Sequence, residues 1–384
     1  MHYIYISGAI PEELNDKLCW SVAGNKFSIN MARAIDARTG GNLSFISTAP
    51  IPSDIDVSSL EIWQGKPLLI AKRGTRFLFS ELKLRRSIKK LLRHISTEHK
   101  GEEIAVIIEN SPFAAATASD ALKKRLGLRL YSITIDTPFT RDFSSRSIAG
   151  KINKALFDLG NRALKKFDGI ISFTEDVKED LQIDIPFCPF LIGMDEKDIP
   201  DKLLPINAGH NAVYAGTLIC YNGIRELVGA YSMLGEDYKL DIYGYGPLED
   251  FVKESAEKYP NISFKGRFSP RDTKEILSQY DLLINPRIID SSIENYTFPS
   301  KLIDYIISGK SVISSAFKTL PEEYKEFIYI FEDMTPEKMA SDIRLLYSDT
   351  LEARQKKVDA AIEYLKKHQT YKKQAEKILE FIKK

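Results

Sequence analysis

The sequence predicts an α/β fold of two doubly wound domains, each with a parallel sheet covered by helices. Short apolar segments of strand length alternate with segments of helical periodicity along the chain, which is typical of parallel sheets. The stretch 196–211, rich in Pro, Gly and Asn, interrupts this alternation and is expected to be a linker. Because 384 residues suffice for two domains of about 150 to 200 residues, we expect domains at 1–195 and 212–370, facing each other across a cleft, and a last helix at 371–384.

The first half begins with a short strand and a long loop at 8–26. Apolar runs predict strands at 3–7, 43–47, 60–63, 68–70, 103–109, 130–135 and 169–173. Helical periodicity predicts helices at 25–37, 77–94, 114–126 and 148–167. Ligands of an open α/β sheet bind at the carboxyl ends of strands, so Asp136 is a candidate polar contact. A turn or a helix cap explains this Asp equally well.

The alternation resumes after the linker. Strands are predicted at 212–214, 239–243, 262–265, 282–285, 311–314 and 329–331. Helices are predicted at 223–234, 248–259, 271–279 and 299–308, and the lysine-rich end from 335 to 384 is also helical.

Composition excludes several kinds of site. The formal charge of +1 argues neither for nor against nucleic acid, and we expect no nucleic-acid partner. Five scattered histidines give little support to a metal site. Cys19, Cys188 and Cys220 lie far apart in apolar surroundings, so we expect reduced, structural thiols. The N-terminus lacks a basic region before an apolar run, and no window approaches 18 uncharged apolar residues. We therefore expect a cytoplasmic protein without a spanning helix.

The segment 77–94 predicts a basic amphipathic helix, because six Lys and Arg residues between 83 and 93 alternate with apolar residues at helical spacing. Two interpretations remain open. One is an ordinary helix with a solvated face. The other is a patch at 82–93 that contacts anionic lipid headgroups or a diphosphate-linked acceptor.

The stretch 285–313 predicts a strand, a polar loop, a short helix and a second strand. Pro299 suits the first helical position and Gly309 the C′ position. A helix N-terminus at the end of a parallel strand favours anions, and Arg287 and Lys301 flank it as a possible diphosphate clamp. Asp304, one turn into the helix, is suited to accept hydrogen bonds from sugar hydroxyls. Any strand–loop–helix unit of such a domain has a comparable loop, so these residues alone do not decide between a phosphate site and an ordinary loop.

A long ordered motif connects this stretch to a known family. Asn-Pro-Arg, Glu294, Tyr-Thr-Phe-Pro-Ser-Lys, Asp-Tyr and Ser-Gly-Lys-Ser-Val resemble the donor-site signature of GT-B glycosyltransferases, closest to family 4, group 1, in a branch with a Phe-Pro-Ser-Lys turn. Three glycine-containing strand ends precede it in the order found in that family: Tyr-Ala-Gly-Thr-Leu, Asp-Ile-Tyr-Gly-Tyr-Gly-Pro and Lys-Gly-Arg-Phe-Ser-Pro. The resemblance covers about residues 212 to 316, and the first half is similar only in architecture.

The resemblance implies a GT-B fold in which the first domain holds the acceptor, the second binds a nucleotide-diphosphate-sugar as co-substrate, and the last helix crosses back to the first domain. It implies retention of anomeric configuration with neither metal nor cofactor. The catalytic candidates are Arg287, Lys301 and Glu294. The acceptor side is assigned to Asp136 and Asn25. The donor-binding candidates are Gly216, Thr217, Tyr243, Gly244, Gly246, Arg267, Phe268, Tyr296, Thr297, Phe298, Pro299, Ser300 and Asp304.

The sequence departs from the family pattern at the diphosphate clamp. Thr217 and Asn222 stand where family members commonly place Arg and Lys. The usual pair of glutamates is altered too, with Asp304 at the second position and Tyr296, near Glu294, at the first. We infer from the resemblance that Arg287 and Lys301 replace the missing clamp.

These observations favour a retaining glycosyltransferase that moves a sugar to a glycan or lipid-linked acceptor in cell-surface polysaccharide or glycolipid assembly, peripheral on the inner face of the membrane through the basic helix. The alternative, motivated by the missing Arg and Lys, is a non-catalytic GT-B subunit that binds a partner transferase or a glycan. A sugar-nucleotide epimerase is a third hypothesis, although it requires acid–base groups for which the sequence shows no clear set.

Overall fold

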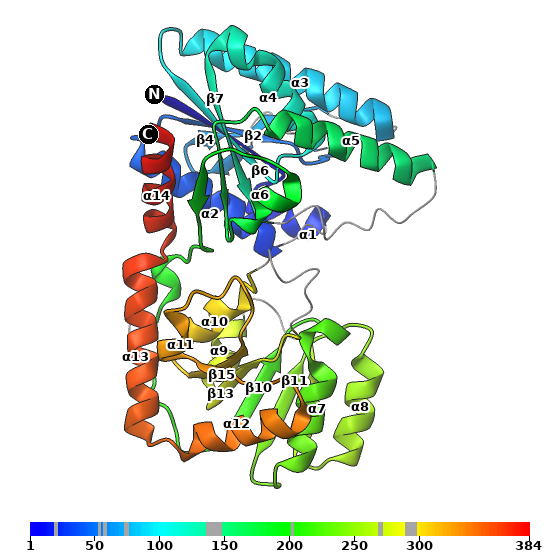
Figure 1. Cartoon of the computed structure of the whole chain (residues 1–384), viewed down its shortest axis with the longest axis vertical. Coiled ribbons are helices and arrows are strands. Elements are labelled where there is room, and N and C mark those ends of the chain that lie inside the picture. The colour runs from blue at the N-terminus through cyan, green and yellow to red at the C-terminus, as the bar shows by residue number, and fades with distance from the viewer. Residues whose placement is uncertain are drawn as a thin grey trace. The chain divides into compact units, whose positions relative to one another are not determined.

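The computed structural model describes the chain except residues 19–21, 53–54, 57–59, 73–76, 136–147, 201–202, 268–271 and 289–297. The chain forms two compact units (Figure 1). The first unit consists of Met1–Gly193 and Gln369–Lys384, and the second consists of Met194–His368. The whole stretch 196–211, which was expected to be a linker, therefore belongs to the second unit, and a short 3-10 helix lies at Glu196–Asp198.

The first unit contains a seven-stranded sheet in the order β5-β2-β1-β6-β7-β8-β9, and its strands pair in parallel. A separate antiparallel pair joins β3 and β4. The strands are β1 His2–Ser7, β2 Leu43–Ser47, β3 Glu61–Trp63, β4 Lys66–Pro67, β5 Leu69–Ile70, β6 Ile104–Glu109, β7 Leu128–Thr134, β8 Gly169–Ser172 and β9 Phe187–Pro189.

Helices cover both faces of this sheet because the strands bury apolar side chains on both sides. The first face packs against α3 (Phe77–Glu98), α4 (Phe113–Leu126) and α5 (Ile148–Leu164). The other face packs against α2 (Val22–Arg38) and the last helix, α14 (Tyr371–Lys383). Two short helices complete the unit, α1 (Asn15–Leu18) and α6 (Asp176–Leu181).

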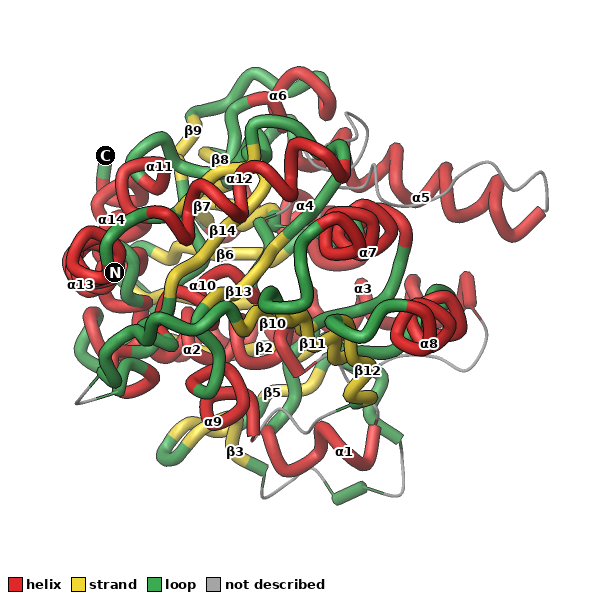
Figure 2. The backbone as a smooth tube through the Cα atoms, turned by 90° about the horizontal axis from the view of Figure 1, so that it is seen from below, coloured by secondary structure: helices red, strands yellow, loops and turns green. Residues whose placement is uncertain are grey.

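The second unit contains a six-stranded parallel sheet in the order β12-β11-β10-β13-β14-β15. Its strands are β10 Asn211–Ala215, β11 Lys239–Tyr243, β12 Ile262–Gly266, β13 Leu282–Asn285, β14 Ser311–Ser315 and β15 Tyr329–Phe331. Figure 2 shows the strands of both sheets, in yellow, flanked by helices, in red. The predicted fold class of two doubly wound parallel sheets is confirmed.

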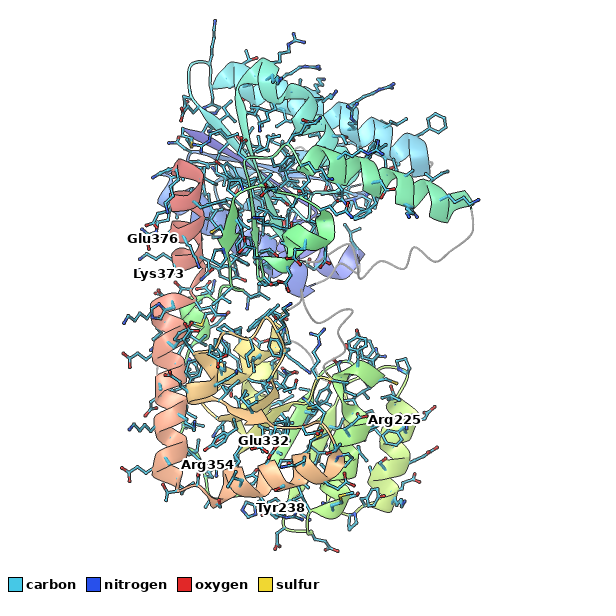
Figure 3. The ribbon with its side chains drawn as sticks, viewed as in Figure 1. Arg225, Tyr238, Glu332, Arg354, Lys373 and Glu376 are labelled. Carbon is cyan, nitrogen blue, oxygen red and sulfur yellow. The ribbon has the colours of Figure 1, made fainter. Side chains whose placement is uncertain are left out.

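The helices of the second unit form two layers. One face of the sheet packs against α7 (Ile224–Met233), α8 (Glu249–Lys258) and α12 (Pro336–Ser348). The helix α13 (Leu351–His368) contacts α10 (Lys301–Ile307) and α11 (Tyr324–Phe327). The helices α10 and α13 contact β14, and α11 contacts β15. The short α9 (Thr273–Ser278) precedes β13. From α13, the buried Arg354 extends into the unit (Figure 3) and donates to Ser311 Oγ over 3.2 Å and to the Asp281 carbonyl over 3.3 Å.

Several local expectations differ from the structure. The strand β9 and the helices α1 and α11 were not predicted, because they are too short to show a period. Pro299 is not the first helical position: α10 begins at Lys301, and the Pro299 carbonyl accepts from the Leu302 N–H in a tight preceding turn. Gly309 does take the left-handed conformation expected at C′, with φ 71°. Cys188 is buried, whereas Cys220 is exposed. The prediction of apolar surroundings is therefore wrong for Cys220.

Candidate donor site of the second unit

The site lies where the strand order of the second sheet reverses. The chain runs outward from β10 to β11 and β12, and then returns to place β13 on the other side of β10. In open parallel sheets this reversal separates the two neighbouring loops and leaves a ligand-binding crevice at the carboxyl ends of the strands. Here those loops begin at Gly216, after β10, and at Pro286, after β13.

Tyr305 bonds to the end of β10 beyond the last residue that pairs with β13. The ladder between β10 and β13 ends at Val213. Two residues further on, the Ala215 N–H donates to Tyr305 Oη over 2.9 Å, and the hydroxyl in turn donates to the Ala215 carbonyl over 3.1 Å. The side chain from α10 thus replaces the missing neighbouring strand and fixes α10 against the end of β10.

The glycine turns predicted to line the site lie against one another. The Gly216 N–H donates to the Tyr243 carbonyl over 3.1 Å, and the Gly244 N–H donates to the Gly266 carbonyl over 2.8 Å. Gly244 has φ 149°, and a Cβ atom there would collide with the Gly216 carbonyl oxygen. The close stacking of these loops therefore requires glycine at position 244.

Gly223 joins the other side of the site. Its φ is 69°, and a Cβ atom there would collide with the carbonyl oxygen of Pro286. The Ile288 N–H also donates to the Tyr221 carbonyl over 2.9 Å. The loop after β10 is therefore fixed to the loop after β13, which carries Arg287.

Two cations meet at this edge of the sheet. The Lys301 Nζ atom lies 4.2 Å from the centre of the Tyr214 ring and close to Gly216, and the Arg287 guanidinium carbon lies 5.9 Å from the centre of the Tyr221 ring. Burial and, second, the positive charge of Arg287 lower the pKa of Lys301 to about 7. An anion placed here would favour the charged form of this amine.

The N-terminus of α10 contributes less than expected. The helix has seven residues, and Ser300 at its N-cap makes no side-chain capping bond. Its dipole is correspondingly short, and the charged groups beside it are the side chains of Arg287 and Lys301. The buried Phe298 packs edge-on against Phe317, with ring centres 5.6 Å apart, and anchors the turn before the helix.

Thr217 and Asn222, which stand at the positions of the usual Arg and Lys clamp, have local structural roles. The Thr217 carbonyl accepts from Tyr214 Oη over 2.9 Å and from Asn222 Nδ2 over 2.7 Å. These bonds close the turn after β10. The Thr217 side chain is exposed at this edge of the sheet.

The remaining described candidates lie around the same edge. The Arg267 guanidinium carbon is 4.1 Å from the centre of the exposed Tyr245 ring. The hydroxyl of Tyr243 accepts from Tyr280 over 3.2 Å, and Asp304 is exposed on α10. Gly246, Pro299 and Ser300 belong to the turns already described. Asp136, Phe268, Glu294, Tyr296 and Thr297 lie outside the described residues.

In the first unit, Asn25 is buried and holds a loop. Its side-chain amide accepts from the Ile10 N–H over 2.9 Å, donates to the Ile10 carbonyl over 2.8 Å and donates to Asn15 Oδ1 over 2.9 Å. These bonds fix the loop after β1, so Asn25 shapes this loop instead of presenting a free amide to a ligand.

Sequence reasoning missed Tyr214 and Tyr305. Both are fully buried, and their sequence patterns are those of core residues in a strand and a helix. The one sequence signal for Tyr214 is that it lies two residues before Gly216, in the turn that follows the strand. The described residues contain no group of three His, Cys, Asp or Glu suited to a metal ion. None of the described helices combines the length and apolar character needed to cross a bilayer.

The second unit, which contains this edge of the sheet, matches the model of a known protein family. Residues 195–368 match the family model of glycosyl transferases group 1. The matched residues coincide with the second unit to within one residue at its start. No curated protein sequence matches the chain.

The fold of the whole chain is shared with solved structures. Sucrose-phosphate synthase from Thermosynechococcus elongatus is 14% identical, with a TM-score of 0.67 over 100% of this chain and 98% of its own. Anabaena Alr3699/HepE in complex with UDP is 11% identical, with a TM-score of 0.68 over 100% of both chains. WaaG, a glycosyltransferase involved in lipopolysaccharide biosynthesis, is 14% identical, with a TM-score of 0.61 over 99% of both. At these identities the likeness establishes the fold, which is GT-B with two Rossmann-like domains.

Proposed function

We propose that the protein is a glycosyltransferase that takes a sugar from a nucleotide-diphosphate-sugar bound at the carboxyl edge of the second sheet. The observation that carries this proposal is that Lys301 and Arg287, both cationic side chains, lie near each other at the strand-order reversal of a unit that matches the group 1 family. Two cations beside closely stacked glycine turns suit a diphosphate, since backbone can approach the ligand and both charges are close to it.

The chemistry requires stabilisation of a leaving diphosphate. Cleavage of the sugar–phosphate bond increases negative charge on the diphosphate, and fixed cations in a partly desolvated site stabilise that charge. We assign this role to Arg287 and Lys301. The proposed reaction retains anomeric configuration and uses no metal, as the resemblance of the motif implies, and Glu294 is kept as a candidate near the reacting sugar.

The nucleotide is proposed to be a uridine diphosphate sugar in the first instance. Anabaena Alr3699/HepE, which shares the fold, has been solved with UDP and with UDP-glucose. The exposed pair of Arg267 and Tyr245 is suited to contact the base by stacking.

The proposed acceptor is a glycan or lipid-linked molecule at the inner face of the cell membrane, reached through the basic helix. The exposed face of α3 carries Lys83, Arg86 and Lys90. Phe79 is 67% exposed and Leu82 is 38% exposed at the start of the same face. Apolar side chains beside cations are typical of helices that lie on anionic bilayers.

The activity is tested by following nucleoside diphosphate release from UDP-glucose, UDP-galactose, UDP-N-acetylglucosamine, GDP-mannose and ADP-glucose. The acceptor is a lipid and glycan extract of the source cells. We expect release with one donor, and a loss of about a hundredfold or more in the rate for Arg287→Ala and Lys301→Ala. Lys356→Ala, an exposed lysine on α13, is the matched control and should keep the wild-type rate.

Nucleoside diphosphate binding without release from any donor would favour the non-catalytic subunit. The motivation for that alternative is that Thr217 and Asn222 bond to each other in closing the turn, where family members commonly place Arg and Lys. Release that is as fast in Arg287→Ala and Lys301→Ala as in the wild type would contradict the roles assigned to these residues.

The membrane contact is tested separately with vesicles of neutral lipid containing one third anionic lipid. The variant Lys83→Gln, Arg86→Gln, Lys90→Gln removes three charges, each worth about 1 kcal/mol near an anionic surface, so binding should weaken by more than about a hundredfold. Added salt should have a similar effect on the wild type.

The matched control neutralises three exposed lysines on α13: Lys356, Lys366 and Lys367. It should bind vesicles as the wild type does. Equal losses in both variants, or no binding of the wild type at low salt, would refute a contact through α3.

A further inference from the structure

The amino edge of the second sheet, opposite the proposed donor site, gathers polar side chains that the proposed reaction does not use. Because the strands are parallel, the residues that directly precede them lie along one edge. These residues are His210 before β10, Tyr238 before β11, Asp281 before β13 and Lys310 before β14. The His210 ring stacks on the ring of Tyr238, which marks this edge in Figure 3, with centres 4.5 Å apart. The edge is therefore a packed polar cluster.

Two tyrosine hydroxyls in this cluster are buried without a hydrogen bond. Tyr347, from α12, packs edge-on against His210 with ring centres 4.5 Å apart, and Tyr231, from α7, is completely buried. Neither Oη atom has a hydrogen-bond partner among the described residues. Burial, and then the neighbouring hydroxyls of Tyr347 and Tyr238, raise the pKa of Tyr231, and burial also raises the pKa of Tyr347. Both hydroxyls therefore keep their protons, and native proteins rarely leave such buried donors without an acceptor.

The guanidinium group of Arg354 lies against the same tyrosine ring. Its Cζ atom is 5.0 Å from the centre of the Tyr347 ring, and the residue is 2% exposed. Nε and Nη2 donate to Ser311 Oγ and to the Asp281 carbonyl, which are both neutral acceptors. In the described part of the chain, Nη1 has no hydrogen-bond partner and the guanidinium forms no ion pair. A buried positive charge without a counter-charge is costly, so this cation calls for an anion.

The carboxylates that act on this region, Asp281 and Asp349, are engaged elsewhere. The strands β13 and β14 pair from their first residues, so Asp281 lies beside the buried Lys310. Burial lowers the pKa of Lys310, and the charge of Asp281 opposes this shift. Asp349 accepts from Tyr329 Oη over 2.7 Å. Lys310 thus offsets the charge of Asp281, and the charge of Arg354 remains unbalanced.

We propose that the amino edge of the second sheet binds a small inorganic anion of the size of chloride, held by the Arg354 guanidinium and the hydroxyls of Tyr231 and Tyr347. The anion balances the buried charge and accepts the two hydroxyl protons. Because these donors are shielded from solvent, the site suits a compact anion and excludes a bulky organic one. The site joins α7, α12 and α13, so its occupation stabilises the second unit, and the inference is independent of the proposed function.

The experiment is thermal unfolding of the full chain in sodium chloride and in sodium gluconate at equal ionic strength. Chloride at ten times its Kd should raise the Tm of the second unit by about 3–6 °C relative to gluconate, whose anion is too bulky for the site. Tyr231→Phe and Tyr347→Phe each remove one donor without breaking a hydrogen bond. Both variants should therefore keep the wild-type Tm in gluconate and lose most of the shift in chloride. Tyr364→Phe, a half-buried tyrosine near the other end of α13 from Arg354, is the matched control and should shift as the wild type does.

Bromide gives a direct location for the ion. Crystals grown in sodium bromide should show an anomalous diffraction peak between Arg354 and the hydroxyls of Tyr231 and Tyr347. An equal wild-type Tm in chloride and gluconate would overturn the proposal and assign the two hydroxyls to a buried water. A chloride shift that persists in both tyrosine variants, or bromide peaks only at other places, would also overturn it.

Discussion

The protonation of Lys301 should control how tightly the second unit binds a nucleoside diphosphate. Burial and the charge of Arg287 lower the pKa of Lys301 to about 7, so about half of the unliganded protein carries a neutral amine at pH 7. A diphosphate beside Nζ favours the charged form and should return the pKa towards its ordinary value of about 10.4. Binding should therefore take up a proton, and should weaken as the pH rises above 7.

The size of the effect follows from these two pKa values. The charged fraction of the unliganded site falls from about one half at pH 7 to about one hundredth at pH 9, whereas the bound amine stays charged. The Kd for UDP should therefore increase about fiftyfold between pH 7 and pH 9. Over this range the terminal phosphate is already ionised, since such groups titrate near pH 6.

The assay is isothermal titration of UDP at pH 7, 8 and 9, repeated with Lys301→Arg. An arginine stays protonated throughout, so the Kd of this variant should change little with pH. Titration at pH 8 in two buffers of different ionisation enthalpy should also show uptake of nearly one proton by the wild type. A wild-type Kd that changes less than threefold, or a Lys301→Arg profile that follows the wild type, would refute this account of Lys301.

Further substitutions test the framework. Gly244→Ala should lower the unfolding free energy by more than about 2 kcal/mol, because its Cβ collides with the Gly216 carbonyl. The control Gly235→Ala, whose Cβ enters open space, should change it by less than about 0.5 kcal/mol. Urea unfolding measures both variants, and equal effects would contradict the close stacking of the glycine turns. Tyr305→Phe should cost about 1–3 kcal/mol in the same assay, since it leaves two backbone groups of β10 unpaired, and an unchanged midpoint would contradict its role. Burial is the main cause that lowers the pKa of His2 to about 4, from its ordinary 6.5. The stability that neutral His2 provides is therefore complete above pH 6.5 and is lost as the pH falls to 4. His2→Asn should reduce this loss of unfolding free energy in acid by at most about 3 kcal/mol, and pH profiles identical to the wild type would exclude His2 as its source.

Much of the fold could be predicted because both sheets are parallel and buried on two faces. Their strands are continuous apolar runs separated by amphipathic helices, a pattern that survives without tertiary information. Elements of three or four residues, such as β9 and α11, were missed because they have no period to detect. The start of α10 was misplaced because a local rule for Pro299 ignored the tight turn that precedes the helix.

An ordered motif led to the proposal of a donor site at the carboxyl edge of the second sheet, with Arg287 and Lys301 as its cations. The residues that shape this edge were not predicted. Tyr305 and Tyr214 look like core residues in sequence, and their hydroxyl partners, Ala215 and Thr217, are backbone groups that only the register of β10 brings near.

The central claim is that Arg287 and Lys301 form the diphosphate site of the second unit. The most direct measurement is the thermal unfolding of the wild type, Arg287→Ala, Lys301→Ala and the control Lys356→Ala with UDP, GDP and ADP. A ligand at a hundred times its Kd should stabilise the protein by about 2.7 kcal/mol, which is a clear shift in Tm. We expect a shift in Tm with one diphosphate in the wild type and the control, and no shift with it in Arg287→Ala or Lys301→Ala. A shift that persists in both, or no shift with any diphosphate, would contradict it.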